Sequence, residues 1–216
     1  MIDPMSIDLF RFFVDWTGPP DANPSPLGAS HRWLPEPLKQ WFELTSQWSE
    51  PFMRLKRMRR PEEIEAEDGK AIFMEDPTGD WLWAFDTDKT NVVYEAELGG
   101  RWDRATEFLP ELLVHNALSE ATYNARAWRE YDNVEERFVT DILTPLDEVA
   151  LGEWRWPSPG HRVFMGTALV AEVSPTMDLC TWETKPGYAD LRIAASDVER
   201  LSYLDRIASI RWSKSR

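Results

Sequence analysis

The segment Trp81–Asp86, which reads Trp-Leu-Trp-Ala-Phe-Asp, constrains the fold more than any other part of the chain. In an extended strand its three aromatic side chains share one face, while Leu82 and Ala84 line the opposite face. A strand that is apolar on both faces has to be covered on both sides, so it belongs in the interior of a sheet. We therefore expect the domain to be built around this strand.

Two further apolar stretches, Ala71–Glu75 and Asn91–Leu98, flank this strand across short polar turns, which predicts an antiparallel meander. Asn91–Leu98 alternates apolar and polar residues, which places it nearer a sheet edge. A helix should follow, with Thr106 as its cap and Glu107 near its positive end. Its expected buried stripe consists of Phe108, Leu109, Leu112, Leu113, Ala117 and Leu118.

The remaining elements follow from the same periodicities and turn signals. Helices are predicted over Asp8–Trp16 and Leu34–Trp48, through Ala121–Trp128, around Val134, Phe138 and Ile142, and from a capping box at Ser196. Strands are predicted over Val163–Val173, Met177–Glu183 and Tyr188–Ala194, after an ordered connection over Leu143–Pro159. The expected class is α+β: a single domain with a mixed or antiparallel sheet and a central meander flanked by several helices.

The charge balance is strongly acidic, with 38 acidic against 24 basic side chains and a net charge of −14. Such a field repels nucleic acid and anionic lipid, whose recognition depends on Lys and Arg. It would attract a basic protein, although solubility alone also explains acidity. The single cysteine, Cys180, in an expected strand, suits a reducing compartment, and neither a signal peptide nor a membrane span is visible. We expect a cytoplasmic protein.

Few residues in the sequence are candidates for metal binding or catalysis. Asp86–Asn91 with Glu97 resembles the ligand spacing of a calcium loop, but it lacks the central glycine and the flanking helices, so a polar turn is favoured. The histidines His31, His115 and His161 are isolated in sequence, and His115 suits a structural role on the leucine-rich helix. We expect no enzyme activity, no metal and no cofactor, because no catalytic or phosphate-binding motif is present.

Five basic residues precede an acidic run and could form a phosphate-binding patch or neutralise the adjacent carboxylates. The acidity of the chain favours charge pairing. The basic residues are Arg54, Lys56, Arg57, Arg59 and Arg60.

The order of several motifs resembles the SUKH superfamily, the Smi/Knr-type proteins widespread in bacterial toxin–immunity systems. The motifs are Leu34-Pro35 with Leu38 and Trp41-Phe42, Pro61-Glu62-Glu63-Ile64, Asp68-Gly69, Ile72-Phe73, Trp81–Asp86, and Phe108-Leu109 with Leu112-Leu113. The match covers residues 33–118 well, and residues 119–216 would be a C-terminal extension of the same domain. The resemblance implies a non-catalytic α+β binding protein, commonly an immunity protein that neutralises a cognate toxin, often a nuclease.

The expected partner is therefore a basic toxin domain. An intracellular scaffold or regulatory adaptor of the same fold is the alternative, and a hydrolase or calcium-binding protein is a third hypothesis. The oligomeric state stays open between monomer and homodimer. Candidate residues for the partner surface are the acids Glu62, Glu63, Glu65, Glu67, Asp68, Asp86 and Asp88.

Overall fold

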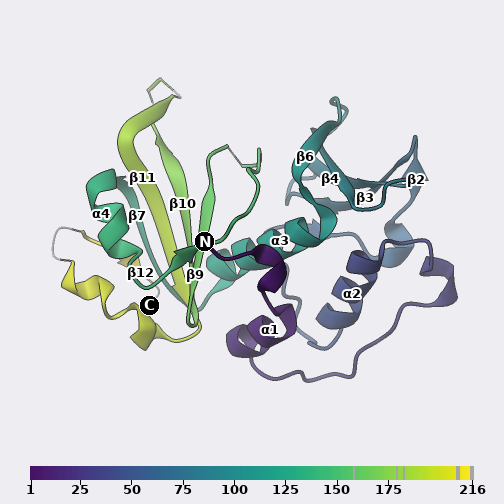
Figure 1. Ribbon diagram of the computed structural model, residues 1–216, viewed down its shortest axis with the longest axis horizontal. Coiled ribbons are helices and arrows are strands. Elements are labelled where there is room, and N and C mark those ends of the chain that lie inside the picture. Colours follow the sequence, from purple (N-terminus) through teal and green to yellow (C-terminus); the bar gives the residue numbers. More distant parts are fainter. Residues whose placement is uncertain (158, 179, 182, 208–209, 215–216) are drawn as a thin grey trace.

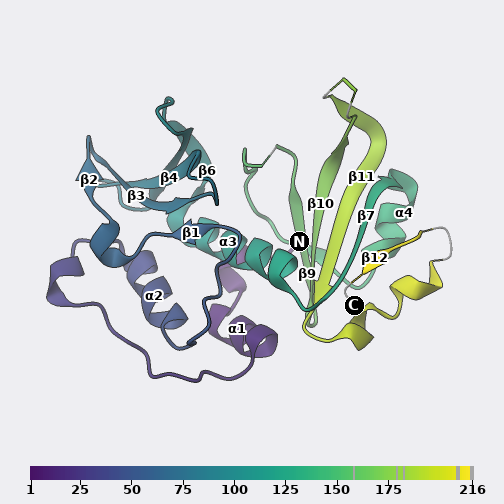
Figure 2. The same cartoon turned by 180° about the vertical axis from the view of Figure 1, so that it is seen from behind.

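Two antiparallel sheets and a central helix make up the fold of the computed structural model, which describes residues 1–157, 159–178, 180–181, 183–207 and 210–214. The helix, α3 (Leu109–Asn124), lies between the sheets in views from both sides (Figures 1 and 2). The α+β class is confirmed. Within the described residues no helix has the length and hydropathy required to span a membrane.

The first sheet has the strand order β1-β3-β4-β5-β6, with β2 paired to β3, and all its pairs are antiparallel. The meander predicted from the sequence forms its centre. The strands are β1 (Arg57–Met58), β2 (Ala66–Glu67), β3 (Lys70–Glu75), β4 (Trp81–Asp86), β5 (Val92–Glu97) and β6 (Asp103–Phe108).

Strand β4 is an interior strand, as its two apolar faces predict. It pairs with β3 on one side and β5 on the other, and Trp83 and Phe85 are fully buried. Strand β5 lies nearer a sheet edge than β4, as predicted, and β6 pairs with it and forms the edge itself. The segment with Thr106 and Glu107 is thus a strand, and neither residue caps a helix.

Helix α3 (Leu109–Asn124) begins after Phe108, whose N–H donates to the Glu111 carboxylate at 2.9 Å. Every residue from Leu112 to Thr122 is buried, so the helix has no solvent face. The buried stripe expected on one side of this helix therefore includes too few residues. It also includes Phe108 wrongly, because this side chain is 46% exposed. The helix is buried on all sides because one sheet lies on each side of it.

The second sheet has the order β12-β7-β11-β10-β9-β8, again with all pairs antiparallel. It packs against α3 through β9, β10 and β11, and α4 lies on β7 and β11. The elements are β7 (Ala127–Glu135), α4 (Glu136–Ile142), β8 (Asp147–Glu148), β9 (Arg162–Gly166), β10 (Leu169–Met177), β11 (Thr184–Ala195) and β12 (Ser213–Lys214).

Several sequence predictions fail in this half. The helical pattern expected through Ala121–Trp128 ends at Asn124, because β7 pairs with β11 from Ala127 onward. Val163–Val173 is two strands joined by a turn in which Ala168 has a φ of 58°. Of the strand expected over Met177–Glu183, Met177 is the last residue of β10 and the other described residues form a turn, while residues 179 and 182 lie outside the described part of the chain. Cys180 lies in this turn and is exposed, not buried in a strand.

The end of the chain also departs from a regular helix. Asp197, and not Ser196, caps the first of two short 3₁₀ turns by accepting from the Glu199 N–H at 3.0 Å. Leu201 and Leu204 still point inward and are fully buried. The two turns are η4 (Val198–Leu201) and η5 (Leu204–Arg206).

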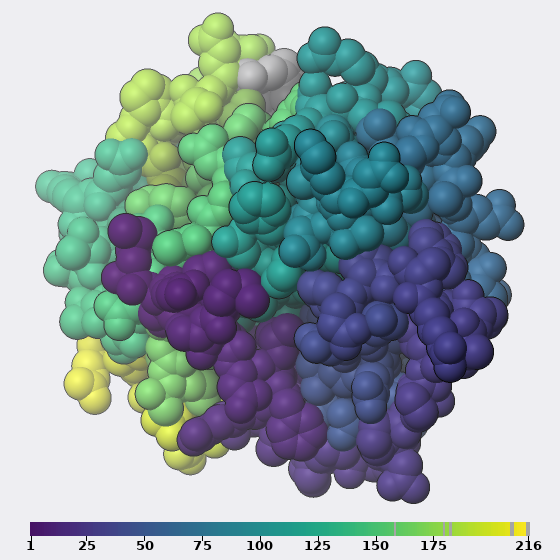
Figure 3. Space-filling model, turned by 45° about the vertical axis from the view of Figure 1, so that its right-hand side comes forward, coloured from purple at the N-terminus to yellow at the C-terminus, as the bar shows by residue number. Residues whose placement is uncertain are grey.

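The N-terminal segment joins both halves. Ile2 bridges to Val149 near β8, while α1 and the first 3₁₀ turn contact α3. In the space-filling view the N-terminal segment (purple) lies against green and teal parts of the surface (Figure 3). The Asp8 carboxylate caps α1 by accepting from the Arg11 N–H at 3.0 Å. The remaining helical elements are η1 (Pro4–Ser6), α1 (Leu9–Thr17), η2 (Ala29–His31), α2 (Glu36–Thr45) and η3 (Pro61–Glu63).

The buried apolar residues form two clusters, one on each side of the molecule. The larger cluster joins the inner face of the first sheet to α1, α2 and most of α3. The smaller one lies between the outer face of the second sheet, α4 and the C-terminal 3₁₀ turns. The ordered connection predicted over Leu143–Pro159 is confirmed for its described residues: Trp154 is 5% exposed and lies near Trp83 of β4.

Candidate functional site

Acidic side chains gather at one corner of the first sheet. Glu67 pairs with Lys70 across the β2–β3 hairpin, and Lys70 pairs in turn with Asp86 at the end of β4. The Thr87 N–H donates to the Gly69 carbonyl at 2.9 Å, so the two hairpin turns lie side by side. We call Glu67, Asp68, Asp86 and Asp88 the acidic corner; Glu65 precedes it in the chain.

The acidic corner is exposed and carries a local excess of negative charge. Glu65, Glu67, Asp68 and Asp88 are exposed and form no ion pair within the part of the chain that the structure describes. Lys70 and Lys89 lie nearby, and the Lys70 ammonium is 4.7 Å from the Tyr94 ring centroid. The carboxylates outnumber these two cations, which leaves a surface suited to a basic partner.

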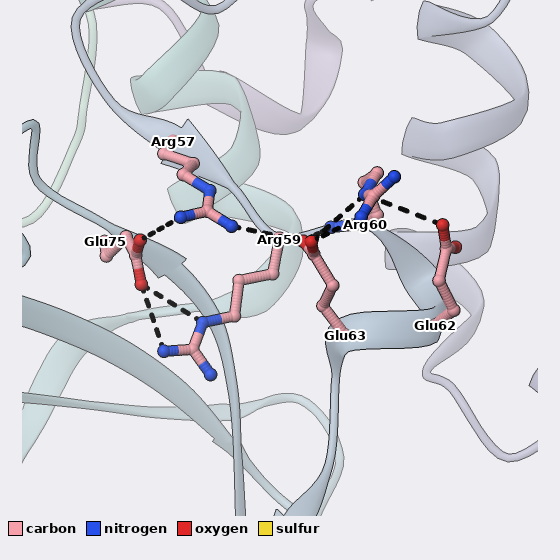
Figure 4. A network of polar contacts seen from close by, with 6 residues as sticks. All are labelled: Arg57, Arg59, Arg60, Glu62, Glu63 and Glu75. Atoms are coloured by element: carbon pink, nitrogen blue, oxygen red, sulfur yellow. Dashed lines mark hydrogen bonds and ion pairs between the residues drawn. The ribbon is translucent and has the colours of Figure 1, made fainter.

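Glu62 and Glu63, which were also expected at the partner surface, are occupied by internal ion pairs (Figure 4). The Arg60 guanidinium lies 2.7 Å from the Glu63 carboxylate, and this hydrogen bond lowers the pKa of Glu63 to about 2. Arg57 and Arg59 both bind Glu75 at 3.0 Å. The predicted pairing with the adjacent acidic run is thus confirmed for Arg57 and Arg60, whereas Arg59 pairs with Glu75 on β3.

The turn after β4 does not arrange calcium ligands. The Asp86 carboxylate accepts from the N–H groups of Asp88 and Lys89 at 2.9 and 2.8 Å, and these bonds help to lower its pKa. Glu97, the expected twelfth-position ligand, pairs with Trp81 at the opposite end of the β4–β5 hairpin. Among the residues that the structure describes, no group of acids, histidines and cysteines could hold a metal ion.

The histidines serve different parts of the fold. His115 is buried on α3 and its Nδ1 lies 2.8 Å from a Glu107 carboxylate oxygen. His161 Nδ1 lies 2.6 Å from Glu172 on β10. His31 is in η2, away from both pairs in the chain. The structural role predicted for His115 fits its burial and its carboxylate partner.

A buried polar centre, which sequence reasoning missed, connects the basic segment with α3. Glu120 accepts hydrogen bonds from the consecutive N–H groups of Arg54, Leu55 and Lys56 at 2.8, 2.8 and 2.7 Å. The Lys56 ammonium lies 3.4 Å from the Ser119 hydroxyl. A lone glutamate inside a helix carries no sequence signal for such a role.

Lys56 differs from its arginine neighbours because its side chain is buried. Its ammonium lies 4.5 Å from the Trp154 ring centroid and 5.1 Å from that of Trp156. Burial lowers the pKa of Lys56 to about 8, against the opposing influence of Glu120 and Glu172. The cation is therefore part of the interior and unavailable to a surface ligand.

Two hollows open to solvent near these groups. The larger, of about 660 Å³, is lined by Trp41, Trp48 and Phe52 together with the basic segment. Its arginines are already paired with glutamates, including Arg54 with Glu50 at 3.2 Å. The smaller, of about 440 Å³, lies where residues 155–157 meet the far end of the β4–β5 hairpin.

Comparisons with known proteins identify no relative of this chain. No family model matches the chain, and neither a curated protein nor a solved structure does.

Proposed function

We propose that the protein is a non-catalytic binding module for a basic protein. The observation that carries the proposal is the acidic corner, where β3 brings the turns of two hairpins together through its pairing with β2 and β4. Exposed carboxylates without internal partners attract a basic surface and speed its association. The net charge of −14 acts in the same direction at longer range.

The specific form of this proposal is an immunity protein that occludes the active site of a cognate toxin, with a nuclease as the expected class. The motif order over residues 33–118 supports it, and the positive surface of many nucleic-acid enzymes would complement the acidic corner. The alternative is an intracellular adaptor that binds a basic protein but protects against no toxin.

Co-expression tests the immunity function. The chain should restore growth to cells that express the toxin encoded beside its gene, and the two proteins should copurify. If a basic protein binds without any protection against that toxin, the adaptor is favoured. If no basic protein binds at all, the binding-module proposal is wrong.

Charge reversal tests the surface. Asp68→Lys with Asp88→Lys should slow association with the basic partner by about tenfold or more at low salt, and the difference should shrink as salt is added. The matched control is Glu136→Lys with Asp141→Lys, which makes the same charge change on exposed residues of α4 beside the second sheet. Equal slowing by both pairs would show that net charge acts alone and that the acidic corner has no special role.

A further inference from the structure

The smaller hollow combines carboxylates with indole rings. It lies at the opposite end of the β4–β5 hairpin from the acidic corner and has a volume of about 440 Å³. Asp80 and Glu97 line it beside Trp81 and Trp156, with Arg155 at one wall. We call this hollow the indole pocket.

The carboxylates of Asp76, Asp80 and Glu97 line the indole pocket together with one arginine, Arg155. Asp80 and Glu97 are exposed and form no ion pair among the described residues, and the Leu98 N–H bonds the Asp80 carbonyl at 2.7 Å to hold them side by side. The Arg155 guanidinium binds Asp103 at 2.6 Å, and Glu95 and Glu97 also lie close enough to attract it. The pocket therefore has more negative charge than its own arginine neutralises.

A buried carboxylate behind the wall of the pocket points to the same deficit. Glu95 lies on the sheet face that carries Trp81 and Glu97 and is 3% exposed. Burial raises its pKa against the opposing influence of Arg155 and the Trp81 indole, and the neighbouring carboxylates of Glu107 and Asp103 raise it further. The carboxylates around Arg155 therefore outnumber it, which favours a further cation at this end of the hairpin.

The chemistry of the wall shows which donor fits. The Arg155 guanidinium lies 5.5 Å from the Trp81 ring centroid while it binds a carboxylate, so a guanidinium already occupies this combination of indole and acid. Trp156, Asp80 and Glu97 also line the pocket, so it contains a second indole and two further carboxylates. A planar guanidinium can stack on an indole and donate two parallel bonds to a carboxylate, which an ammonium cannot do.

We propose that the indole pocket binds the guanidinium of an arginine side chain on the basic partner protein. This inference rests on the proposed function and adds a second point of contact at the far end of the same hairpin. Arginine side chains in aromatic pockets contribute much of the binding energy at protein interfaces. The acidic corner would then steer the partner, and the indole pocket would anchor it.

The test is a titration of the ¹⁵N-labelled full chain with N-acetylarginine amide, followed through the indole N–H signals, which Trp→Phe variants assign. Saturable shifts should be largest at Trp81 and Trp156, and the neutral isostere N-acetylcitrulline amide should produce none. Asp80→Asn with Glu97→Gln should weaken binding of the arginine probe by about fivefold or more. Asp68→Asn with Asp88→Asn, at the acidic corner, should leave it unchanged.

Equal shifts with the citrulline probe, or undiminished binding in the Asp80→Asn/Glu97→Gln variant, would overturn the guanidinium pocket. The probe needs no partner protein, so its failure is distinguishable from failure of the proposed function. If the chain binds a basic protein but not the arginine probe, only the proposal of a guanidinium pocket is wrong. If it binds the probe but no basic protein, the binding-module proposal is wrong and the pocket is still an arginine site.

Discussion

Trp154 donates its indole N–H to the Glu107 carboxylate at 2.7 Å, and the two residues are 47 positions apart in the chain. The same carboxylate accepts the Gly152 N–H at 2.9 Å and lies 2.8 Å from His115 Nδ1. The His115 ring stacks on Trp154 with 3.7 Å between the ring centroids. Glu107 therefore fixes the connection to the second sheet against both β6 and α3.

Replacement of this carboxylate should destabilise the whole domain. Glu107→Gln keeps the size of the side chain but puts an amide NH₂ where one carboxylate oxygen now accepts a bond, leaving a buried donor without its acceptor. We expect the free energy of unfolding to fall by about 2–4 kcal/mol in urea titrations. The control is Glu153→Gln, an exposed neighbour, which should change stability by less than about 0.5 kcal/mol. Equal stability of the two variants would contradict the role of Glu107.

Gly152 should tolerate no side chain. A Cβ at this position would overlap Thr106 Oγ1 and lie 2.6 Å from Glu107 Cγ, so these two side chains or the backbone that carries them would have to shift. Gly152→Ala should cost about 2 kcal/mol or more and lower the melting temperature. Gly28→Ala is the matched control, because its Cβ would meet nothing closer than 3.9 Å and its φ of −63° suits alanine. A neutral Gly152→Ala would show that the loop does not lie this close to β6.

Glu120 should protect three consecutive backbone amides from hydrogen exchange. In Glu120→Gln one carboxylate oxygen becomes an NH₂ that cannot accept, so some of the N–H groups at residues 54–56 lose their partner. We expect these amides to exchange about tenfold faster or more, while amides of β4 stay protected. Glu50→Gln, which removes the exposed partner of Arg54, should leave the exchange unchanged. Unaltered exchange in Glu120→Gln would refute the prediction.

Lys56 should make stability depend on pH in the alkaline range. Its pKa is lowered from 10.5 to about 8 in the folded protein, chiefly by burial, so between these values the unfolded chain binds more protons. Stability from this group must then rise as pH increases from about 8 toward 10.5, because neutral lysine no longer opposes burial. Below pH 8 the buried charge lowers stability by a constant amount.

Lys56→Met should remove this rise and increase the free energy of unfolding at pH 7 by roughly 1–3 kcal/mol, provided that the thioether fills the space between the indoles. The measurement is a series of urea titrations from pH 7 to pH 10. Lys89→Met, at an exposed position, should retain the rise. A wild-type protein whose stability is flat or falls over this range, relative to Lys56→Met, would contradict the sign.

The sequence predicts the fold best where one strand or helix carries its own complete signal. Strand β4 is apolar on both faces and lies where expected, and the spacing of Phe12, Phe13 and Trp16 is sufficient to locate α1. Helix α3 shows the limit, because His115, Ser119 and Glu120 appear as a polar face in sequence. Their burial depends on a second sheet whose position no local pattern specifies.

The candidate site likewise has a part that the sequence predicts and a part that depends on contacts between distant segments. The exposed acids of the two hairpin turns could be named from the sequence, but their proximity depends on β3 pairing with both β2 and β4. The pairing of Glu62 and Glu63 with arginines is consistent with the adjacent basic and acidic segments, which predict that charges pair but not which residues do. The burial of Lys56, among arginines that remain at the surface, depends on Trp154 and Trp156 arriving from a distant loop.

The burial of α3 from Leu112 to Thr122 also limits how a chain of this kind can change over generations. Because the helix supplies a wall to each sheet, a gene fragment that ends before or after it encodes a half with bare apolar surface. Neither half can be gained, lost or exchanged as a module, and a recombination point is tolerable only where little is buried. Insertions are best accommodated in the exposed hairpin turns, at Asp68-Gly69 and Gly99-Gly100, which are also the places where a new partner would first be met.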